Sequence, residues 1–100
     1  MTEMEKLEGL AGTAARAHPL GVGGQQLLVD YSNRYGVSVV TFRGSYGYEE
    51  GLLELAVFKD GSLCYDTPIT SDVVGHLTAE EAFEIMKKVE ALPAPPPVTP

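Results

Sequence analysis

Alternating apolar and polar residues in the middle of the chain predict a β-hairpin. The stretch Leu52–Asp66 reads LLELAVFKDGSLCYD, and Asp60-Gly61 interrupts its alternation. Asp-Gly between two alternating runs is a strong hairpin signal, because a type I′ turn needs positive φ at both central positions. With these two residues as the turn, Phe58 faces Leu63. Both faces of the hairpin carry apolar side chains, so we expect it to lie centrally in a sheet.

Two further strands are predicted before this hairpin. Gln25–Tyr31 alternates in the same way, and Val37–Arg43 is dominated by β-branched and aromatic residues. A polar turn that ends in Gly36 joins them as a second hairpin. The sequence therefore predicts an α+β fold whose sheet is a four-stranded antiparallel meander.

Helical spacing replaces strand alternation near the C-terminus. Thr78 and Glu81 form a capping box, which predicts a helix from Ala79 to Leu92, ahead of Pro93. We expect this helix to pack across one face of the sheet. Before it, Ser71–Leu77 is expected to be a compact connection with space for one helical turn.

The N-terminal segment is harder to interpret. Residues 2–18 carry a partial apolar stripe behind a capping threonine, but Gly9 and Gly12 each cost roughly 1 kcal/mol in a helix. The segment is thus either a docked short helix or an arm that orders only on a partner. We divide the chain into this arm with its glycine-rich linker (1–24), one α+β domain (25–92) and a disordered proline-rich tail (93–100).

A single helix leaves one face of the predicted sheet uncovered. That face carries apolar residues of the central hairpin, so either the N-terminal helix or a second copy of the protein should cover it. We favour a homodimer. The predicted dimer interface consists of Phe58, Leu63 and Tyr65.

Charge narrows the classes of partner. Residues 44–100 hold ten acidic and three basic residues, which account for the whole net charge of −7. Direct binding of DNA or RNA is disfavoured, since it requires a basic surface. An acidic half suits a protein partner with a basic surface, or serves solubility alone. The lack of a long apolar run, together with a single cysteine, Cys64, predicts a cytoplasmic protein that has no membrane partner.

The sequence offers few candidates for catalytic or metal-binding residues. The histidines are His18 and His76; Ser71 and Asp72 lie close to His76, but all three share one short connection and no nucleophile elbow is present. Cys64 sits within a predicted strand and has no base nearby in sequence. No spacing of ligand residues matches a metal site. We therefore expect no catalytic residues, no metal and no cofactor, and predict that the protein is not an enzyme.

A loop rich in glycine and tyrosine is the best candidate for recognition. Gly44–Gly51 contains two tyrosines, whose rigid rings give contact area, and small residues that adapt their hydrogen bonding. The alternative is that the tyrosines pack on the end of the sheet. The predicted binding residues are Tyr46, Tyr48, Glu49, Glu50 and Glu54.

The run Gly44–Glu81, GSYGYEEGLLELAVFKDGSLCYDTPITSDVVGHLTAEE, resembles small uncharacterised proteins of phages and mobile elements. The resemblance covers about two-fifths of the chain and assigns no functional residue. It implies an acidic accessory protein that binds and blocks a host protein, such as a defence or nucleic-acid-binding protein. A structural protein that acts as an obligate homodimer is the alternative function.

Overall fold

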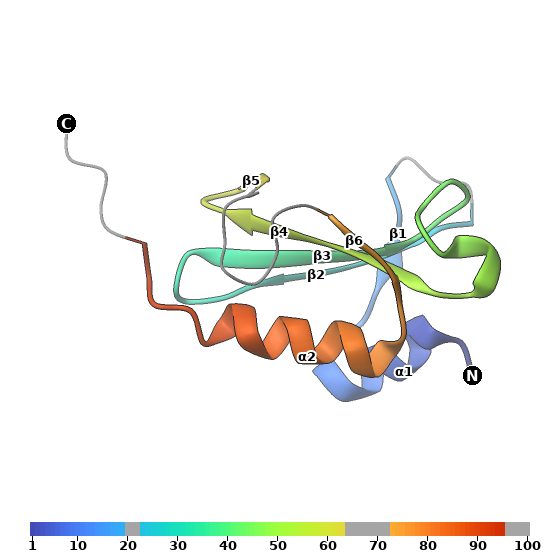
Figure 1. Cartoon of the computed structure of the whole chain (residues 1–100), viewed down its shortest axis with the longest axis horizontal. Helices are drawn as coiled ribbons and strands as arrows, with labels where there is room; N and C mark the ends of the chain where they lie inside the picture. The colour runs from blue at the N-terminus through green and yellow to red at the C-terminus, as the bar shows by residue number, and fades with distance from the viewer. Residues whose placement is uncertain (20–22, 64–72, 96–100) are drawn as a thin grey trace.

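The computed structural model describes residues 1–19, 23–63 and 73–95. An antiparallel sheet lies above two helices in Figure 1, so the fold is α+β as predicted. The helices are α1 (Glu3–Ala11) and α2 (Ala79–Glu90). The strands are β1 (Arg16–Ala17), β2 (Gln25–Asp30), β3 (Tyr35–Thr41), β4 (Leu53–Lys59), β5 (Ser62–Leu63) and β6 (Val74–Leu77).

The sheet contains more strands than the four-stranded prediction. Strands β2, β3, β4 and β5 follow one another as a meander, and Phe58 faces Leu63 as predicted. A short additional strand, β1, pairs with β2, and β6 pairs with the edge of β4 that also carries β5. The connection predicted for Ser71–Leu77 is thus wrong over its last four residues. A strand forms there because β6 supplies backbone partners to a buried stretch of β4.

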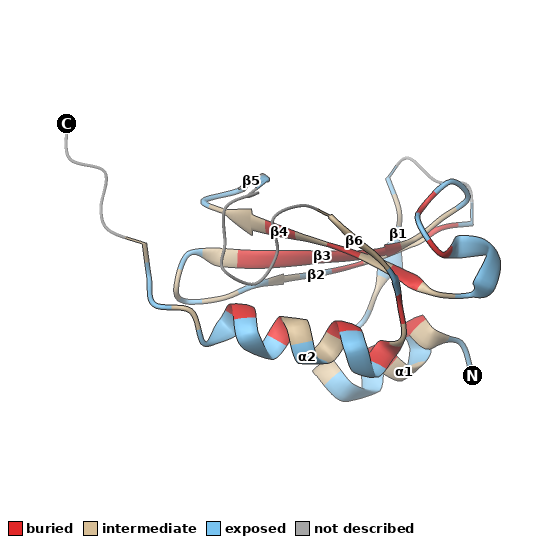
Figure 2. Ribbon diagram, viewed as in Figure 1, coloured by how far each residue is buried: buried red, intermediate tan, exposed pale blue. Residues whose placement is uncertain are grey.

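The core lies between the sheet, at β2, β3 and β4, and the two helices. Figure 2 shows buried residues along β3 and β4 and on the turns of α2 that are nearest the sheet. On β4 the inward positions alternate with half-buried ones, as a strand with one face on a core requires. The most deeply buried large side chains of the core are Met4, Leu7, Leu27, Val37, Val39, Leu53, Leu55, Val57 and Val89.

Helix α1 packs beside α2, on the same face of the sheet. Met4 and Leu7 are only 1% and 0% exposed, so the segment is a docked helix rather than an arm. It ends well before residue 18, because Gly12 adopts a left-handed conformation (φ 69°) that terminates the helix. The idea that this helix covers the second face of the sheet is therefore wrong.

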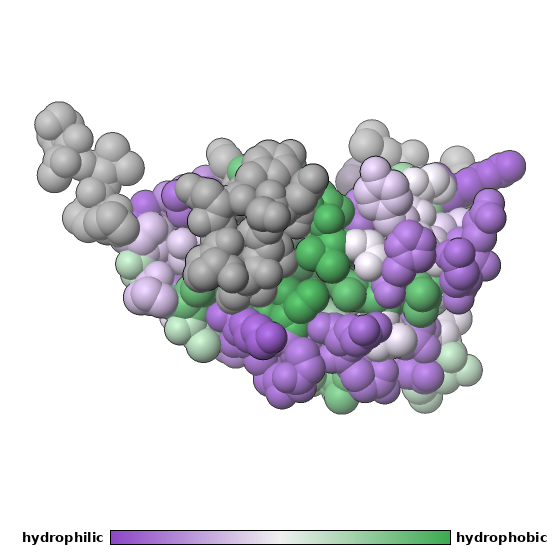
Figure 3. Space-filling view, viewed as in Figure 1, coloured by the Kyte–Doolittle hydropathy of each residue, from purple (hydrophilic) through white to green (hydrophobic). Residues whose placement is uncertain are grey.

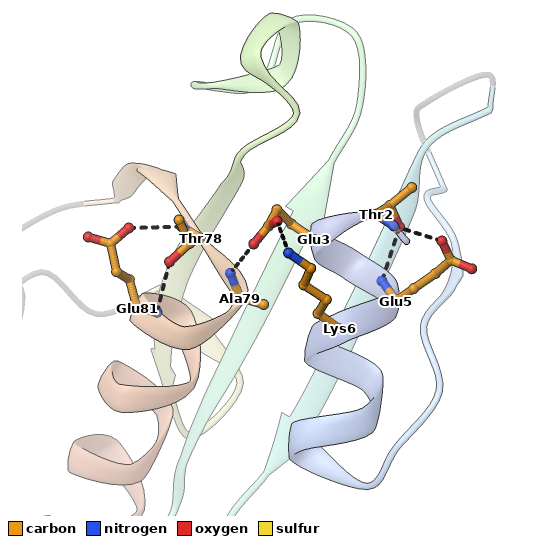
Figure 4. Close-up of polar contacts among 7 residues, drawn as sticks. All are labelled: Thr2, Glu3, Glu5, Lys6, Thr78, Ala79 and Glu81. Carbon is orange, nitrogen blue, oxygen red and sulfur yellow. Dashed lines mark hydrogen bonds and ion pairs between the residues drawn. The ribbon is translucent and has the colours of Figure 1, made fainter.

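One carboxylate joins the starts of the two helices (Figure 4). Glu3 Oε1 accepts a hydrogen bond from the backbone N–H of Ala79 at 2.7 Å, and Glu3 Oε2 lies 3.0 Å from Lys6 Nζ. The bond from Ala79 and the nearby ammonium hold the pKa of the Glu3 carboxyl below its ordinary value. Each helix also has its own capping box, of which the one formed by Thr78 and Glu81 was predicted.

An ion pair joins the turn between β2 and β3 to the turn between β4 and β5. Arg34 makes a bidentate ion pair with Asp60, with Nε–Oδ1 2.8 Å and Nη2–Oδ2 2.6 Å. This guanidinium holds the pKa of the Asp60 carboxyl below its usual range. Asn33 Nδ2 donates to the carbonyls of Val89 and Leu92, both at 2.9 Å, and so caps the end of α2.

The second face of the sheet is less apolar than expected. Leu28 and Leu63 are 42% and 39% exposed there, whereas Gln26 and Ser38 bond to each other at 2.9 Å. Polar side chains thus separate the apolar ones on this face. Of the predicted dimer interface, Phe58 is half-buried on this face, and Tyr65 lies outside the described residues.

We predict that Glu3→Gln lowers the free energy of unfolding by about 1 kcal/mol at pH 7, because a neutral amide accepts the Ala79 bond more weakly than a carboxylate. A carboxyl with a depressed pKa stabilises the fold above its unfolded pKa, about 4.3, and this contribution disappears as pH falls through the lower folded pKa. The wild type should therefore lose more stability than the variant on acidification. Urea unfolding at pH 7, 5 and 3 measures this.

The matched control is Glu80→Gln, which removes an exposed carboxylate from the first turn of α2 without breaking a hydrogen bond. It loses the same favourable interaction with the helix dipole but leaves the Glu3 contact intact. Equal destabilisation by both variants would show that the Glu3–Ala79 bond contributes nothing specific.

Candidate interaction site

The loop between β3 and β4 is held by its own hydrogen bonds. Ser45 is buried; its Oγ accepts from the Phe42 N–H at 3.1 Å and donates to the Phe42 carbonyl at 2.8 Å. A single 3-10 turn, Tyr48–Glu50, follows between Gly47 and Gly51, which both have positive φ. The three glycines seen in the sequence thus belong to a folded loop with defined turns.

A β-bulge in β6 faces this loop. Leu53 pairs with Leu77 and Leu55 with Val74, so β6 has one more residue than β4 between these pairs. The bulge contains His76, whose backbone is left-handed with φ 57°. A non-glycine residue in this conformation costs about 1–2 kcal/mol, and bulges of this kind commonly re-aim a side chain at a functional site.

The backbone of one residue, Tyr46, bonds the loop to β4 and to β6. The Tyr46 N–H donates to Glu54 Oε2 at 2.8 Å, and the Tyr46 carbonyl accepts from the His76 N–H at 3.3 Å. Two glycines make this close approach possible. A Cβ on Gly47 would lie 2.9 Å from the His76 Cα, and a Cβ on Gly75 would collide with the Tyr46 side chain.

An open cavity of about 310 Å³ results from this packing. Tyr46 and Tyr48 are 62% and 42% exposed at it, although the base of the Tyr46 side chain lies against Gly75 of β6. In Figure 3 hydrophilic side chains gather at this end of the molecule and along α2. The cavity is lined by Arg43, Gly44, Ser45, Tyr46, Gly47, Tyr48, Glu49, Glu50 and His76.

The structure thus brings the five predicted binding residues to one region, in two different roles. Tyr46, Tyr48, Glu49 and Glu50 line the cavity, whereas Glu54 lies on β4 and holds the loop in place. Sequence reasoning did not place His76 at this site. The available signal was a glycine next to a histidine, Gly75-His76, within a short apolar run. This dipeptide is recognised as a bulge only when β6 is seen to pair with β4.

Comparison of the chain with protein-family models, with curated proteins and with solved structures found no match. Among the described residues, no group of three or more His, Cys, Asp and Glu side chains is placed to hold a metal ion. The helices of residues 1–19, 23–63 and 73–95 include none with the length and apolar character needed to cross a bilayer. Ser71, Asp72 and Cys64 lie outside these ranges.

We predict that His76→Gly raises the free energy of unfolding by up to about 1 kcal/mol, because relief of the left-handed strain exceeds the entropic cost of glycine. Thermal unfolding followed by circular dichroism measures the change. His76→Ala is the matched control: it removes the imidazole but keeps a Cβ in the left-handed backbone, so it should bring no gain. A gain in both variants would mean that the imidazole, not the backbone, is the source of strain.

Proposed function

We propose that this protein is a non-enzymatic, acidic binding module that contacts a basic surface of a protein partner through the tyrosine loop, Gly44–Gly51. The observation that supports the proposal most directly is the combination of exposed Tyr46 and Tyr48 with Glu49 and Glu50 around one cavity. Tyrosine is enriched in interfaces because its ring buries a large area while its hydroxyl keeps a hydrogen bond.

The rigidity of the loop also supports recognition. Glu54, His76 and Ser45 each bond to the loop or within it, and two close glycine contacts fix its position. A surface that is already ordered loses little entropy when it binds, so more of the contact energy appears as affinity. His76 keeps a left-handed backbone in the bulge that bonds to the loop, and strained residues of this kind cluster at functional sites.

Electrostatics favour a basic partner. The net charge of −7 accelerates encounters with positively charged surfaces, and exposed Glu49 and Glu50 add a local negative field. The resemblance to small proteins of phages and mobile elements suggests the partner class. We propose a host protein whose basic surface otherwise holds nucleic acid, such as a nuclease or a defence protein, which this module would block.

We predict that Glu49→Lys with Glu50→Lys weakens capture of the partner about tenfold, since each exposed ion pair is worth up to about 1 kcal/mol and reversal adds repulsion. The immobilised protein is incubated with lysate of the source cell at low and high salt. Captured proteins are then quantified by mass spectrometry. The partner should be retained by the wild type, released by salt and largely lost from the double variant.

The matched control is Glu80→Lys with Glu84→Lys, which changes the net charge equally on the exposed face of α2. It should retain the partner. Equal loss from both double variants would show that bulk charge, not the loop, attracts the captured proteins. Glu54 is left unchanged because its carboxylate positions the loop, so its replacement would mix structural and binding effects.

The alternative function, an obligate homodimer, has a specific observation in its favour. Exposed Leu28 and Leu63 lie on the second face of the sheet with Phe58, beside a hollow of about 210 Å³. If this face forms a dimer, Phe58→Glu should halve the mass measured by light scattering, because it buries a charge in the interface. Leu10→Glu, an exposed position on α1, should leave the mass unchanged. A monomeric wild type would exclude the dimer.

A further inference from the structure

One edge of the sheet is only partly paired among the described residues. Strand β1 covers β2 at Gln25 and Gln26 and reaches no further along it. The chain leaves the edge there because it comes from α1, below the sheet (Figure 1), and the Ala15 N–H donates to Glu8 Oε2 at 2.7 Å, which ties this stretch to α1. The second half of β2 thus lies at an open edge.

The direction of the backbone groups on β2 follows from two hydrogen bonds. The His18 N–H donates to the Gly24 carbonyl at 3.0 Å on the β1 side, and the Tyr31 N–H donates to the Tyr35 carbonyl at 2.8 Å on the β3 side. Backbone groups alternate between the two edges of a strand. Leu28 and Asp30 therefore direct their N–H and C=O groups toward the open edge, as Gly24 does toward β1.

A groove runs between this edge and α2. Its volume is about 430 Å³, and apolar side chains from α1, β2 and α2 form its floor. Burial raises the pKa of Tyr31 to about 12, with Glu90 as a smaller cause, so its hydroxyl stays protonated. The groove is lined by Ala11, Val29, Asp30, Tyr31, Phe83, Met86, Lys87 and Glu90.

The charges around the groove are mainly negative. Asp30 and Glu90 are exposed at its rim, and Lys87 lies 2.8 Å from Glu84, which offsets its charge. A basic segment therefore complements this edge. A second copy of the chain does not, because pairing two β2 edges would bring together two sets of these carboxylates on molecules of charge −7.

We propose that the open edge of β2 at Leu28–Asp30 binds an extended, basic segment of a partner protein by antiparallel β-strand addition. Main-chain hydrogen bonds to Leu28 and Asp30 hold the added strand. Its alternate side chains point in opposite directions: apolar ones enter the groove beside Val29 and Met86, and a lysine or arginine lies opposite Asp30. This surface is separate from the tyrosine loop.

The test uses a seven-residue synthetic peptide of alternating valine and lysine, acetylated and amidated, and a second peptide in which glutamate replaces lysine. Each is titrated to millimolar concentration into the full-length ¹⁵N-labelled protein. The lysine peptide should slow amide hydrogen exchange at Leu28 and Asp30 but not at Val29, whose N–H already bonds to β3. The glutamate peptide should bind weakly or not at all.

Two substitutions of Asp30 test how its charge contributes to the affinity for the peptides. Asp30→Asn should weaken the lysine peptide roughly twofold, and Asp30→Lys roughly fivefold while strengthening the glutamate peptide, since an exposed pair contributes up to about 1 kcal/mol. Glu80→Lys is the control: it has the same effect on net charge as Asp30→Lys, but Glu80 lies in the first turn of α2 and lines neither the groove nor the tyrosine loop, so the affinity should not change. The proposal is overturned if neither peptide protects Leu28 and Asp30, if protection appears elsewhere, or if the edge amides are protected by dimerisation instead.

Discussion

Burial of one face of β4 is the constraint on which the rest of the structure depends. Leu53, Leu55 and Val57 are almost completely buried, and both edges of this strand carry partners. A strand so enclosed needs a helical layer over its apolar face and backbone partners along its length. The two helices provide the first, and β6 returns to the sheet to provide the second. The bulge that carries His76 lies within this pairing.

Local signals in the sequence were sufficient for the central hairpin and the long helix. Asp60-Gly61 predicted the turn and the pairing of Phe58 with Leu63, and Thr78 with Glu81 predicted the start of α2. Each of these features is decided by a few neighbouring residues. The strand β6 could not be predicted in this way, because Val74–Leu77 forms a strand only by pairing with the edge of β4. The position of α1 likewise depends on α2, which lies far from it in sequence.

The same distinction between local signals and contacts of distant segments applies to the candidate site. Composition alone identified the loop with its tyrosines and glutamates, since glycine and tyrosine content is a local property. The role of Glu54 as a support, and the presence of His76, follow from strand pairing and a register shift that no local pattern reports. The open edge of β2 was also missed. Its existence follows from the pairing of β2 with a strand of only two residues, β1, and the sequence did not predict that strand.

The contact between Glu3 and Ala79 has a consequence for the order of folding. These residues are 76 positions apart, and the helices that they join share one core. During synthesis, α1 leaves the ribosome long before its partner helix exists, so Met4 and Leu7 stay without their final contacts until α2 has emerged. Contacts of such long sequence separation slow folding and expose apolar surface in the meantime. Closure of this core therefore requires α2 to have been translated.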